Sequence, residues 1–419
     1  MRMPKTAILH YSAPPVVGGV EAVIEAHART FVEAGYPTTV VAGSGEAPSL
    51  PPGVDWIRIP EMDSQDAQVT KISARLEQGK VPPAFDNMVD QLIGSLEATL
   101  SQFDTVIVHN VFTKHFNLPL TAALHHLLTA GVIRHCVAWC HDFTWTSPSS
   151  SSKVHPGYPW DLLRTYRADV EYVVVSERRQ GELAALLGCP PEQIRVVYNG
   201  VNAEALLGLS VEGHALAQRL GLLESDLIML MPVRVTQAKN IEYALRVVAA
   251  LKGRGCHLRL ILTGPPDPHD AKSMAYFHSL QALRQELGVE EEMRFVFESG
   301  PDPVQGLVIG PEVVGDLFRL GDLMFMPSHR EGFAMPVLEA GLVGIPVVCT
   351  EVPAAVEIGG EDVMLFDTSR EPADLADRIL AWSETDPVHR LRRRVRQDYT
   401  WQAIFERDIK PLLQGQEEA

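Results

Sequence analysis

The 419-residue chain has few cysteines and no excess of positive charge. Its five cysteines are scattered, odd in number and without a Cys-x-x-Cys pair, which favours buried reduced thiols, as in a reducing cytosol, over disulfides or a metal site. Lysine and arginine number 36 against 53 aspartates and glutamates, a formal net charge of −17. Binding to nucleic acid needs a basic surface, so we expect no nucleic-acid partner.

Long apolar runs are also missing. No stretch approaches the ~20 apolar residues that span a bilayer, and residues 1–5 lead into a short strand without a signal-peptide segment. We therefore expect a cytoplasmic protein, with peripheral association with the membrane left open. Five arginines between Arg390 and Arg396 predict a solvated helical face, with a contact to anionic lipid or to a partner as the alternative.

Several motifs with a defined chemistry do not occur. The chain has no P-loop, no HExxH pair, no cysteine–histidine metal spacing and no Ser/His/Asp order. The loop after the first predicted strand lacks the GxGxxG spacing of dinucleotide-binding proteins. No Asp-x-Asp pair follows a strand, so nothing in the sequence calls for a divalent metal.

Short apolar strands alternate with amphipathic helices along the chain. Among the strands, we expect one from Val132 to Cys140 and one from Met293 to Phe297. The alternation runs from about residue 6 to 198, restarts at about residue 227 after the turn at residues 199–202, and is typical of α/β proteins with parallel sheets. We therefore predict two doubly wound, Rossmann-like domains, residues 1–203 and 204–398, that face each other across a cleft.

Polar residues follow several predicted strands of the first domain. Ligands of open α/β sheets bind beyond the carboxyl ends of the strands, so these positions are candidate sites. Each histidine taken alone has a purely structural role as its alternative. The residues are His109, Asn110, His141 and Asp142. Gly18 and Gly19, in the first strand–helix loop, would let the backbone approach a ligand.

Two cations lie in the loop after the first strand of the second domain. Arg234 and Lys239 are five positions apart, close to a strand end and a helix start. Fixed cations in such a place can bind a diphosphate and stabilise it as it leaves. Two solvated surface cations are the alternative interpretation.

Glu331 and Glu339 are eight positions apart, and Pro336 between them suits the first turn of a helix. A turn followed by that helix can direct both carboxylates at one ligand, and the free N–H groups at the helix start suit an anion. Carboxylates bind hydroxyls, so the segment fits a sugar linked to a diphosphate. A surface loop followed by a solvated helix is the alternative.

Together these motifs resemble those of the retaining glycosyltransferases of family 4, which have the GT-B fold of two Rossmann-like domains. The stretch from Glu331 to Glu339 is similar to the family's E-x7-E signature. The supporting matches are Gly18-Gly19-Val20-Glu21, His141-Asp142, residues 198–202, Arg234 with Lys239-Asn240, Pro327-Ser328 and residues 344–348. The segment from Tyr399 resembles the family's last helix, so residues 399–419 are expected to cross back and complete the N-terminal domain.

The resemblance implies a donor-binding role for the residues of the second domain. Glu331 would bind hydroxyls of the donor sugar, and Glu339 would bind the ribose. Arg234 and Lys239 would hold the diphosphate, helped by backbone N–H groups. Those N–H groups belong to Phe333, Ala334 and Met335.

The resemblance implies complementary roles for residues of the first domain, which would lie on the acceptor side. Gly18 and Gly19 would pack against the phosphates, and His141 would lie near the reacting carbon. The remaining candidates for the acceptor side are His109, Asn110 and Asp142.

The implied reaction transfers a hexose from a UDP- or GDP-linked sugar to a hydroxyl acceptor with retention, without a metal and without an enzymic nucleophile. The acceptor, a small molecule, glycan or lipid-linked sugar, and the oligomeric state stay open. So do two alternatives, a phosphorylase or nucleotide-sugar epimerase of the same fold and a non-catalytic nucleotide-sugar-binding protein. Ala334 stands where many relatives have glycine, and residues 352–357 lack a usual glycine pair, which leaves the donor sugar open. Residues 298–311 form a longer segment of unknown role.

Overall fold

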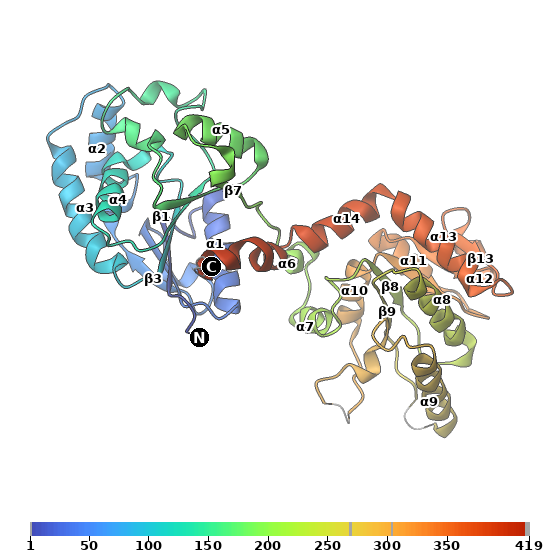
Figure 1. The fold of residues 1–419 in the computed structure, drawn as a ribbon. Coiled ribbons are helices and arrows are strands. Elements are labelled where there is room, and N and C mark those ends of the chain that lie inside the picture. The colour runs from blue at the N-terminus through green and yellow to red at the C-terminus, as the bar shows by residue number, and fades with distance from the viewer. Residues whose placement is uncertain (1, 268–269, 303–304, 415–419) are drawn as a thin grey trace. The chain divides into compact units, whose positions relative to one another are not determined.

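The computed structural model of the chain describes residues 2–267, 270–302 and 305–414 (Figure 1). Contacts within the chain divide it into two compact units. Unit 1 consists of Met1–Val201 and Trp401–Ala419, and unit 2 of Asn202–Thr400. Among the described helices, none combines the length and the apolar character needed to cross a membrane.

Unit 1 is built on a seven-stranded sheet in the order β3-β2-β1-β4-β5-β6-β7, in which all paired strands are parallel. The strands are β1 (Thr6–Ser12), β2 (Thr38–Ser44), β3 (Asp55–Arg58), β4 (Thr105–His109), β5 (Cys136–Cys140), β6 (Val170–Val174) and β7 (Ile194–Val196). The main helices are α1 (Gly19–Glu33), α2 (Ala67–Leu76), α3 (Ala84–Leu100), α4 (Leu118–Thr129) and α5 (Glu177–Leu187).

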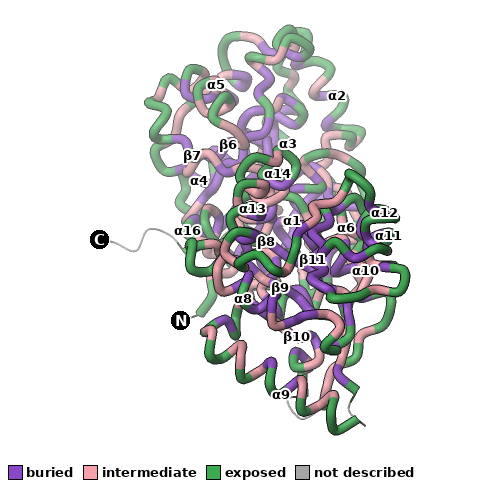
Figure 2. Tube along the Cα trace, turned by 90° about the vertical axis from the view of Figure 1, so that its right-hand side faces the viewer, coloured by how far each residue is buried: buried purple, intermediate pink, exposed green. Residues whose placement is uncertain are grey.

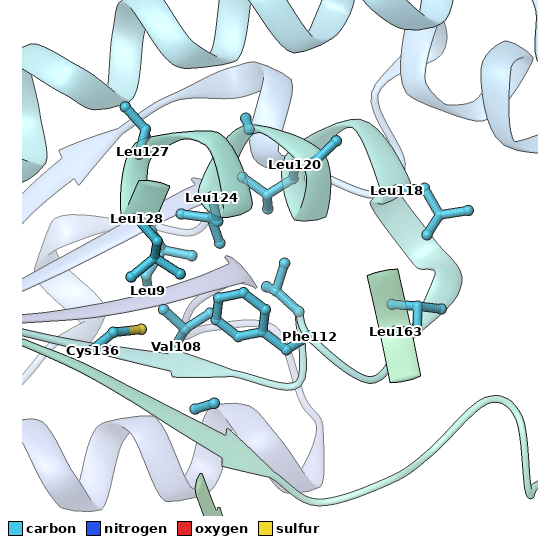
Figure 3. Close-up of a cluster of buried hydrophobic side chains, with 14 of the residues drawn as sticks. Leu9, Val108, Phe112, Leu118, Leu120, Leu124, Leu127, Leu128, Cys136 and Leu163 are labelled. Atoms are coloured by element: carbon cyan, nitrogen blue, oxygen red, sulfur yellow. The ribbon is translucent and has the colours of Figure 1, made fainter. Parts of the chain in front are cut away.

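Both faces of this sheet are covered, because successive residues of a strand point to opposite faces. Leu9 packs in a core cluster with α2, α3 and α4, whereas the adjacent Ile8 packs in a cluster with α1. Figure 3 shows leucines of α4 gathered over Leu9 of β1 and Val108 of β4. Burial on two sides explains why these strands are continuous apolar runs.

The C-terminal segment adds its own side chains to the α1 side of unit 1. It consists of α15 (Trp401–Ile404), a π-helical turn (Phe405–Ile409) and α16 (Lys410–Gln414). Ile404 and Phe405 have no exposed surface and belong to the same core cluster as Ile8. The Trp401 N–H donates to the Val201 carbonyl at 3.2 Å. The segment is therefore an integral part of the core of unit 1.

Unit 2 repeats the architecture with a six-stranded parallel sheet in the order β10-β9-β8-β11-β12-β13. The strands are β8 (Leu227–Met231), β9 (Leu258–Leu262), β10 (Met293–Phe295), β11 (Leu323–Met326), β12 (Val347–Thr350) and β13 (Met364–Phe366). The helices are α6 (Ala203–Leu207), α7 (Val211–Arg219), α8 (Ile241–Gly253), α9 (Ala271–Glu286), α10 (Pro311–Leu320), α11 (Met335–Val343), α12 (Pro353–Gly359), α13 (Pro372–Thr385) and α14 (Pro387–Asp398).

The predicted fold class, two Rossmann-like α/β domains with parallel sheets, is confirmed. Figure 2 shows the pattern that the alternation implies, with buried strands inside exposed helical surfaces. That the domains face each other across a cleft stays a prediction. Within residues 298–311, positions 303 and 304 lie outside the described residues, and the Leu307 N–H donates to the Phe297 carbonyl at 2.9 Å.

Two predicted strand boundaries are wrong for local reasons. The strand expected from Val132 begins at Cys136, because Gly131 ends α4 with a φ of 72° and the Val132 N–H still bonds to the carbonyl of Leu127. The strand expected to reach Phe297 ends at Phe295 and continues as a 3₁₀ turn. In both cases apolar residues next to the strand lie outside the pairing of the sheet.

The predicted solvated face of the arginine run is wrong for part of α14. Arg396 is 7% exposed, and its guanidinium makes two bonds of 2.9 Å to the buried carboxylate of Asp322. Arg393 pairs with Asp226 at 2.6 Å. Both aspartates directly precede strands, β11 and β8, so these arginines fasten α14 to the amino ends of the sheet. Arg390 and Arg394 remain exposed.

Candidate functional site

The loops after β8 and β11 bring a lysine and a glutamate of unit 2 together. The Lys239 Nζ lies 2.7 and 2.8 Å from the two carboxylate oxygens of Glu331, which is 92 residues away in the sequence. The Glu331 side chain is only 8% exposed. The His329 N–H, bonded to the Ala238 carbonyl at 2.9 Å, joins the same two loops through their backbones. This arrangement follows from the direct pairing of β8 with β11.

The start of α11 adds unpaired backbone donors beside Glu331. Ala334 has left-handed backbone angles (φ 60°, ψ 46°) and precedes the first helical residue, Met335. No acceptor for the N–H groups of Phe333, Ala334 or Met335 is found among the described residues. First-turn N–H groups of a helix lack intrahelical partners and suit an anion. The geometry thus places free donors two to four residues from the Glu331 carboxylate.

The other two residues predicted for this site are exposed. Arg234 follows β8, and Glu339 lies on α11. In the part of the chain that the structure describes, neither side chain contacts the Lys239–Glu331 pair. The side chains of Arg234 and Glu339 are therefore accessible to a ligand and are not engaged by the Lys239–Glu331 pair.

Gly264 is a residue of this region that the sequence analysis missed. A Cβ atom there would lie 2.5 Å from the Val233 carbonyl oxygen and 2.8 Å from the Cα of Arg234. Its N–H donates to the Val233 carbonyl at 3.0 Å. Glycine is required where the loop after β9 passes the loop that carries Arg234. The available signal was a glycine at the end of the predicted strand of residues 258–264.

In unit 1, the two glycines before α1 serve different purposes. A Cβ on Gly18 would collide with the carboxylate of Glu21, which is buried and accepts a hydrogen bond of 2.5 Å from the Ser12 hydroxyl. A Cβ on Gly19 would meet nothing within 4 Å. Gly18 therefore makes room for a buried acid, and only Gly19 leaves an open approach to the backbone.

The ends of β4 and β5 are joined by Asn110. Its φ of 59° is left-handed, a conformation that asparagine tolerates better than most residues. Its side-chain oxygen accepts hydrogen bonds from the N–H groups of His141 (2.8 Å) and Asp142 (3.2 Å). Asn110 thus sets the backbone path of the loop that carries two predicted site residues.

The histidines at these strand ends form one buried group. The His109 Nδ1 is 3.1 Å from the His141 Nε2, and the His10 Nδ1 is 2.9 Å from the His109 carbonyl oxygen. His27 on α1 stands 5.4 Å from His109 between ring centroids. His109 has no exposed surface, whereas His141 keeps 8%. Of the two predicted histidines, only His141 reaches the surface.

Burial sets the protonation of this group. Burial, with a smaller contribution from the neighbouring His10, lowers the pKa of His141 to about 4. It lowers the pKa of His109 well below the ordinary value, with added effects of His141, His27 and His10. The histidines are therefore neutral at neutral pH.

Asp142 is exposed, and its carboxylate pairs with Arg179 at 2.9 Å. Arg179 lies in the first turn of α5, behind the N-cap Ser176. Arg179 was not predicted from the sequence, although a Ser-Glu-Arg-Arg stretch that begins two residues beyond the end of β6 was a visible signal. No group of three or more His, Cys, Asp and Glu side chains fit to hold a metal occurs among the described residues.

Two family models match the chain. The model for Glycosyltransferase Family 4 matches residues 17–205, and the model for Glycosyl transferases group 1 matches residues 215–399. Together they account for most of both units. The chain belongs to glycosyltransferase family 4.

Curated relatives are similar over part of their length. An uncharacterized glycosyltransferase of Methanocaldococcus jannaschii is 26% identical over 59% of this chain and 61% of its own length. A D-inositol 3-phosphate glycosyltransferase of Streptomyces scabiei is 31% identical over 46% of this chain and 42% of its own. The putative colanic acid biosynthesis glycosyltransferase WcaL of Salmonella typhimurium is 27% identical over 76% of this chain and 74% of its own length. The chain thus spans less than two thirds of the length of the first two relatives.

Solved structures resemble the chain at low sequence identity. A glycosyltransferase from Rickettsia africae is 15% identical, covers 99% of this chain and 100% of its own, and superposes with a TM-score of 0.38. The Anabaena protein HepE in complex with UDP is 18% identical, and the match covers 98% of this chain and 100% of the HepE chain with a TM-score of 0.34. Likeness of this degree carries no argument about the ligand or the arrangement of the units.

Proposed function

We propose that this family 4 protein is a retaining glycosyltransferase that moves a hexose from a UDP- or GDP-linked sugar to a hydroxyl acceptor. The observation that carries the proposal is the Lys239–Glu331 pair beside the free N–H groups at the start of α11. A hydroxyl-binding carboxylate and an anion-binding helix start within a few residues match the two halves of a sugar diphosphate.

The charge of the pair suits a diphosphate. A lysine ammonium has three N–H donors, and two of them are within bonding distance of Glu331, which leaves one for a phosphate oxygen. Lys239 also offsets the negative charge of Glu331, which would otherwise repel the ligand. Arg234, exposed and without a contact to the pair, would approach the diphosphate as a second cation. Glu339 on the exposed surface of α11 would bind the ribose.

The reaction needs stabilisation of negative charge more than it needs an acid or a base of the enzyme. As the bond between the anomeric carbon and the diphosphate breaks, charge develops on the phosphate oxygens, where Lys239, Arg234 and the α11 N–H groups would stabilise it. The acceptor would attack from the same face, and its proton would pass to the leaving phosphate. No enzymic nucleophile and no metal enters this scheme, and we expect transfer to persist in EDTA.

Unit 1 would supply the complementary contacts. Gly19 offers open backbone, and His141 would lie near the sugar. Asp142, exposed and paired with Arg179, is the acceptor-side candidate that reaches the surface. Asn110 would act through the backbone of His141 and Asp142. The Streptomyces scabiei relative is named a D-inositol 3-phosphate glycosyltransferase, which makes inositol phosphates suitable first acceptors to test.

The experiment first identifies the donor by a binding screen. The activities of the site variants are then measured with that donor and compared with the activity of the wild type. A nucleotide sugar that binds specifically at a hundred times its Kd should stabilise the protein by about 2.7 kcal/mol, visible as a rise in Tm. With that donor and an acceptor panel, Glu331→Gln and Arg234→Met should each lower kcat/KM by roughly 10²-fold or more. Glu312→Gln, an exposed glutamate of α10, is the matched control and should leave kcat/KM unchanged.

Three outcomes would reject the proposal in different ways. Full transfer by both site variants would reject the assigned site. Release of nucleoside diphosphate that does not depend on acceptor would favour a phosphorylase or an epimerase. Binding of nucleotide sugar without turnover on any acceptor would favour a non-catalytic binding protein.

A further inference from the structure

His109 lies between two other histidines inside unit 1. Its Nδ1 is 3.1 Å from the Nε2 of His141, and the two rings stack with centroids 5.4 Å apart. Its Nε2 is buried without a hydrogen-bond partner among the described residues. Because His109 has no exposed surface, it can influence a ligand only through its neighbours, and His141 is the one to which its ring is hydrogen-bonded.

The contact between the two rings requires one donor and one acceptor. Each neutral imidazole carries a single N–H, and burial keeps both pKa values below neutrality. Two arrangements are therefore available. Either the His109 Nδ1–H donates to a bare His141 Nε2, or the His141 Nε2–H donates to a bare His109 Nδ1.

Burial distinguishes the two arrangements. In the second, the single proton of His109 would sit on Nε2, a buried donor with no acceptor. In the first, the atom without a partner is a bare nitrogen. Buried N–H groups without acceptors are the rarer case in proteins, and an unmet donor costs about 1–3 kcal/mol. The first arrangement is therefore favoured.

The surroundings hold His109 in this pose. The His10 Nδ1 must donate to the His109 carbonyl oxygen, because that oxygen can only accept. The His109 ring stacks on the Trp139 ring with the ring centroids 5.8 Å apart. His27 of α1 packs against the His109 ring. No charged carboxylate hydrogen-bonds to the His109 ring in the described part of the chain. Packing rather than an ion pair therefore sets the ring.

We propose that His109 is a positioning residue that holds His141 in the tautomer with its proton on Nδ1. His141 then presents an N–H group at the carboxyl end of β5. It donates a hydrogen bond to a ligand oxygen and does not act as a base through its accessible nitrogen. The identity of that ligand as the donor sugar rests on the proposed function, whereas the tautomer does not.

The tautomer can be measured directly. Protein labelled with ¹⁵N-histidine gives long-range ¹H–¹⁵N spectra that separate the two neutral tautomers, and His141→Gln identifies the His141 signals among the 15 histidines. We expect His141 to be an Nδ1–H tautomer in the wild type and in His109→Asn, whose amide nitrogen lies near the place of Nδ1 and can donate. His109→Leu should release His141 to a mixture. An Nε2–H form in the wild type, or an unchanged tautomer in His109→Leu, would overturn the proposal.

Activity provides the second readout. His109→Leu should lower kcat/KM by about tenfold, the worth of one neutral hydrogen bond, and His109→Asn should recover most of the loss. His125→Leu removes another buried histidine of unit 1 and should change neither tautomer nor kcat/KM. If His109→Leu does not fold, His109→Gln replaces it, because its longer side chain displaces the amide from the Nδ1 position. Wild-type kcat/KM in a variant with an altered tautomer would overturn the positioning role, and a wild type that transfers no sugar would refute only the proposed function.

Discussion

Ala334 shows how one backbone conformation constrains the candidate site of unit 2. Its φ of 60° is costly for any residue with a Cβ, by roughly 1–2 kcal/mol, yet its methyl group is 3% exposed and packs in the core of unit 2. Glycine at this position would remove the strain and lose the contact. Alanine at this position therefore combines a strained backbone with a buried methyl group. Its own N–H is one of the free donors at the start of α11.

Substitutions at Ala334 should separate these two effects. Ala334→Gly should change the free energy of unfolding by less than about 1 kcal/mol, because relief of strain is offset by the loss of a buried methyl worth ~0.8 kcal/mol and by a more flexible unfolded chain. Ala334→Val should cost about 2 kcal/mol or more, because a β-branched residue is poorly tolerated at positive φ. Urea unfolding measures both. Equal stabilities of the glycine and valine variants would show that the backbone there is not left-handed.

Single residues also show which features of the candidate site could be predicted from local sequence and which could not. The carboxylate pair and Pro336 indicated a helix start from sequence alone, and α11 begins at Met335. The contact of Glu331 with Lys239 could not be predicted in the same way, because the sequence shows each loop but not which strands are neighbours. Likewise, position at a strand end alone did not separate His109 from His141, and only the family resemblance singled out His141. The structure adds that His109 has no exposed surface, whereas His141 keeps 8%.

At the scale of elements, α14 illustrates how an arginine-rich helix can be structural. The carboxylate of Asp322 also accepts a hydrogen bond of 2.8 Å from the Ile228 N–H, and Arg396 donates to the Ser225 carbonyl at 2.8 Å. One buried ion pair thus connects α14, the start of β8 and the start of β11. The arginine run predicted a helical face, but charge alone could not indicate which arginine points inward.

Removing the inner arginine should be far costlier than removing an outer one. Arg396→Met leaves the Asp322 carboxylate buried without its main partner and should destabilise unit 2 by about 3–5 kcal/mol. Arg394→Met, on the exposed side of the same helix, should stay within about 0.5 kcal/mol of the wild type. Thermal and urea unfolding provide the comparison.

A double variant gives the internal check on this prediction. Adding Asp322→Asn to Arg396→Met removes the stranded charge and should recover part of the lost stability. Equal stabilities of Arg396→Met and Arg394→Met would contradict the assigned ion pair.

At the scale of the whole molecule, buried histidines are unevenly distributed between the units. Burial lowers the pKa of His27 to about 3 and those of His115, His125 and His141 to about 4, and all four lie in unit 1. In unit 2, burial lowers the pKa of His389. Both ring nitrogens of His27 are buried without a hydrogen-bond partner in the described residues, which explains its resistance to protonation.

Unit 1 should therefore be the more acid-sensitive part. An unfolded histidine binds a proton below about pH 6.5, whereas these folded ones stay neutral until about pH 3–4. Stability is thus complete above pH 6.5 and falls as the pH drops toward the folded pKa values, by about 1.4 kcal/mol per pH unit for each histidine. Hydrogen–deuterium exchange at pH 7.5, 6 and 5 should show unit 1 losing protection before unit 2.

A histidine substitution tests the cause. His27→Phe removes one titrating group from unit 1 and should flatten the decline of stability with falling pH by up to about 1.4 kcal/mol per unit. Earlier loss of protection in unit 2, or an unchanged slope in His27→Phe, would show that other groups control acid unfolding.

Sequence by itself determined the alternation of strands and helices, the two α/β domains, the family and the segments that carry the candidate site, because each of these is written in local periodicity and short motifs. Tertiary structure alone decided which of those segments meet. It paired β8 with β11 and so joined Lys239 to Glu331, turned Arg396 inward, and buried His109 behind His141. The physical reason is that strand order and burial depend on packing between residues far apart in the chain, and the spacing of residues along it carries no record of that packing.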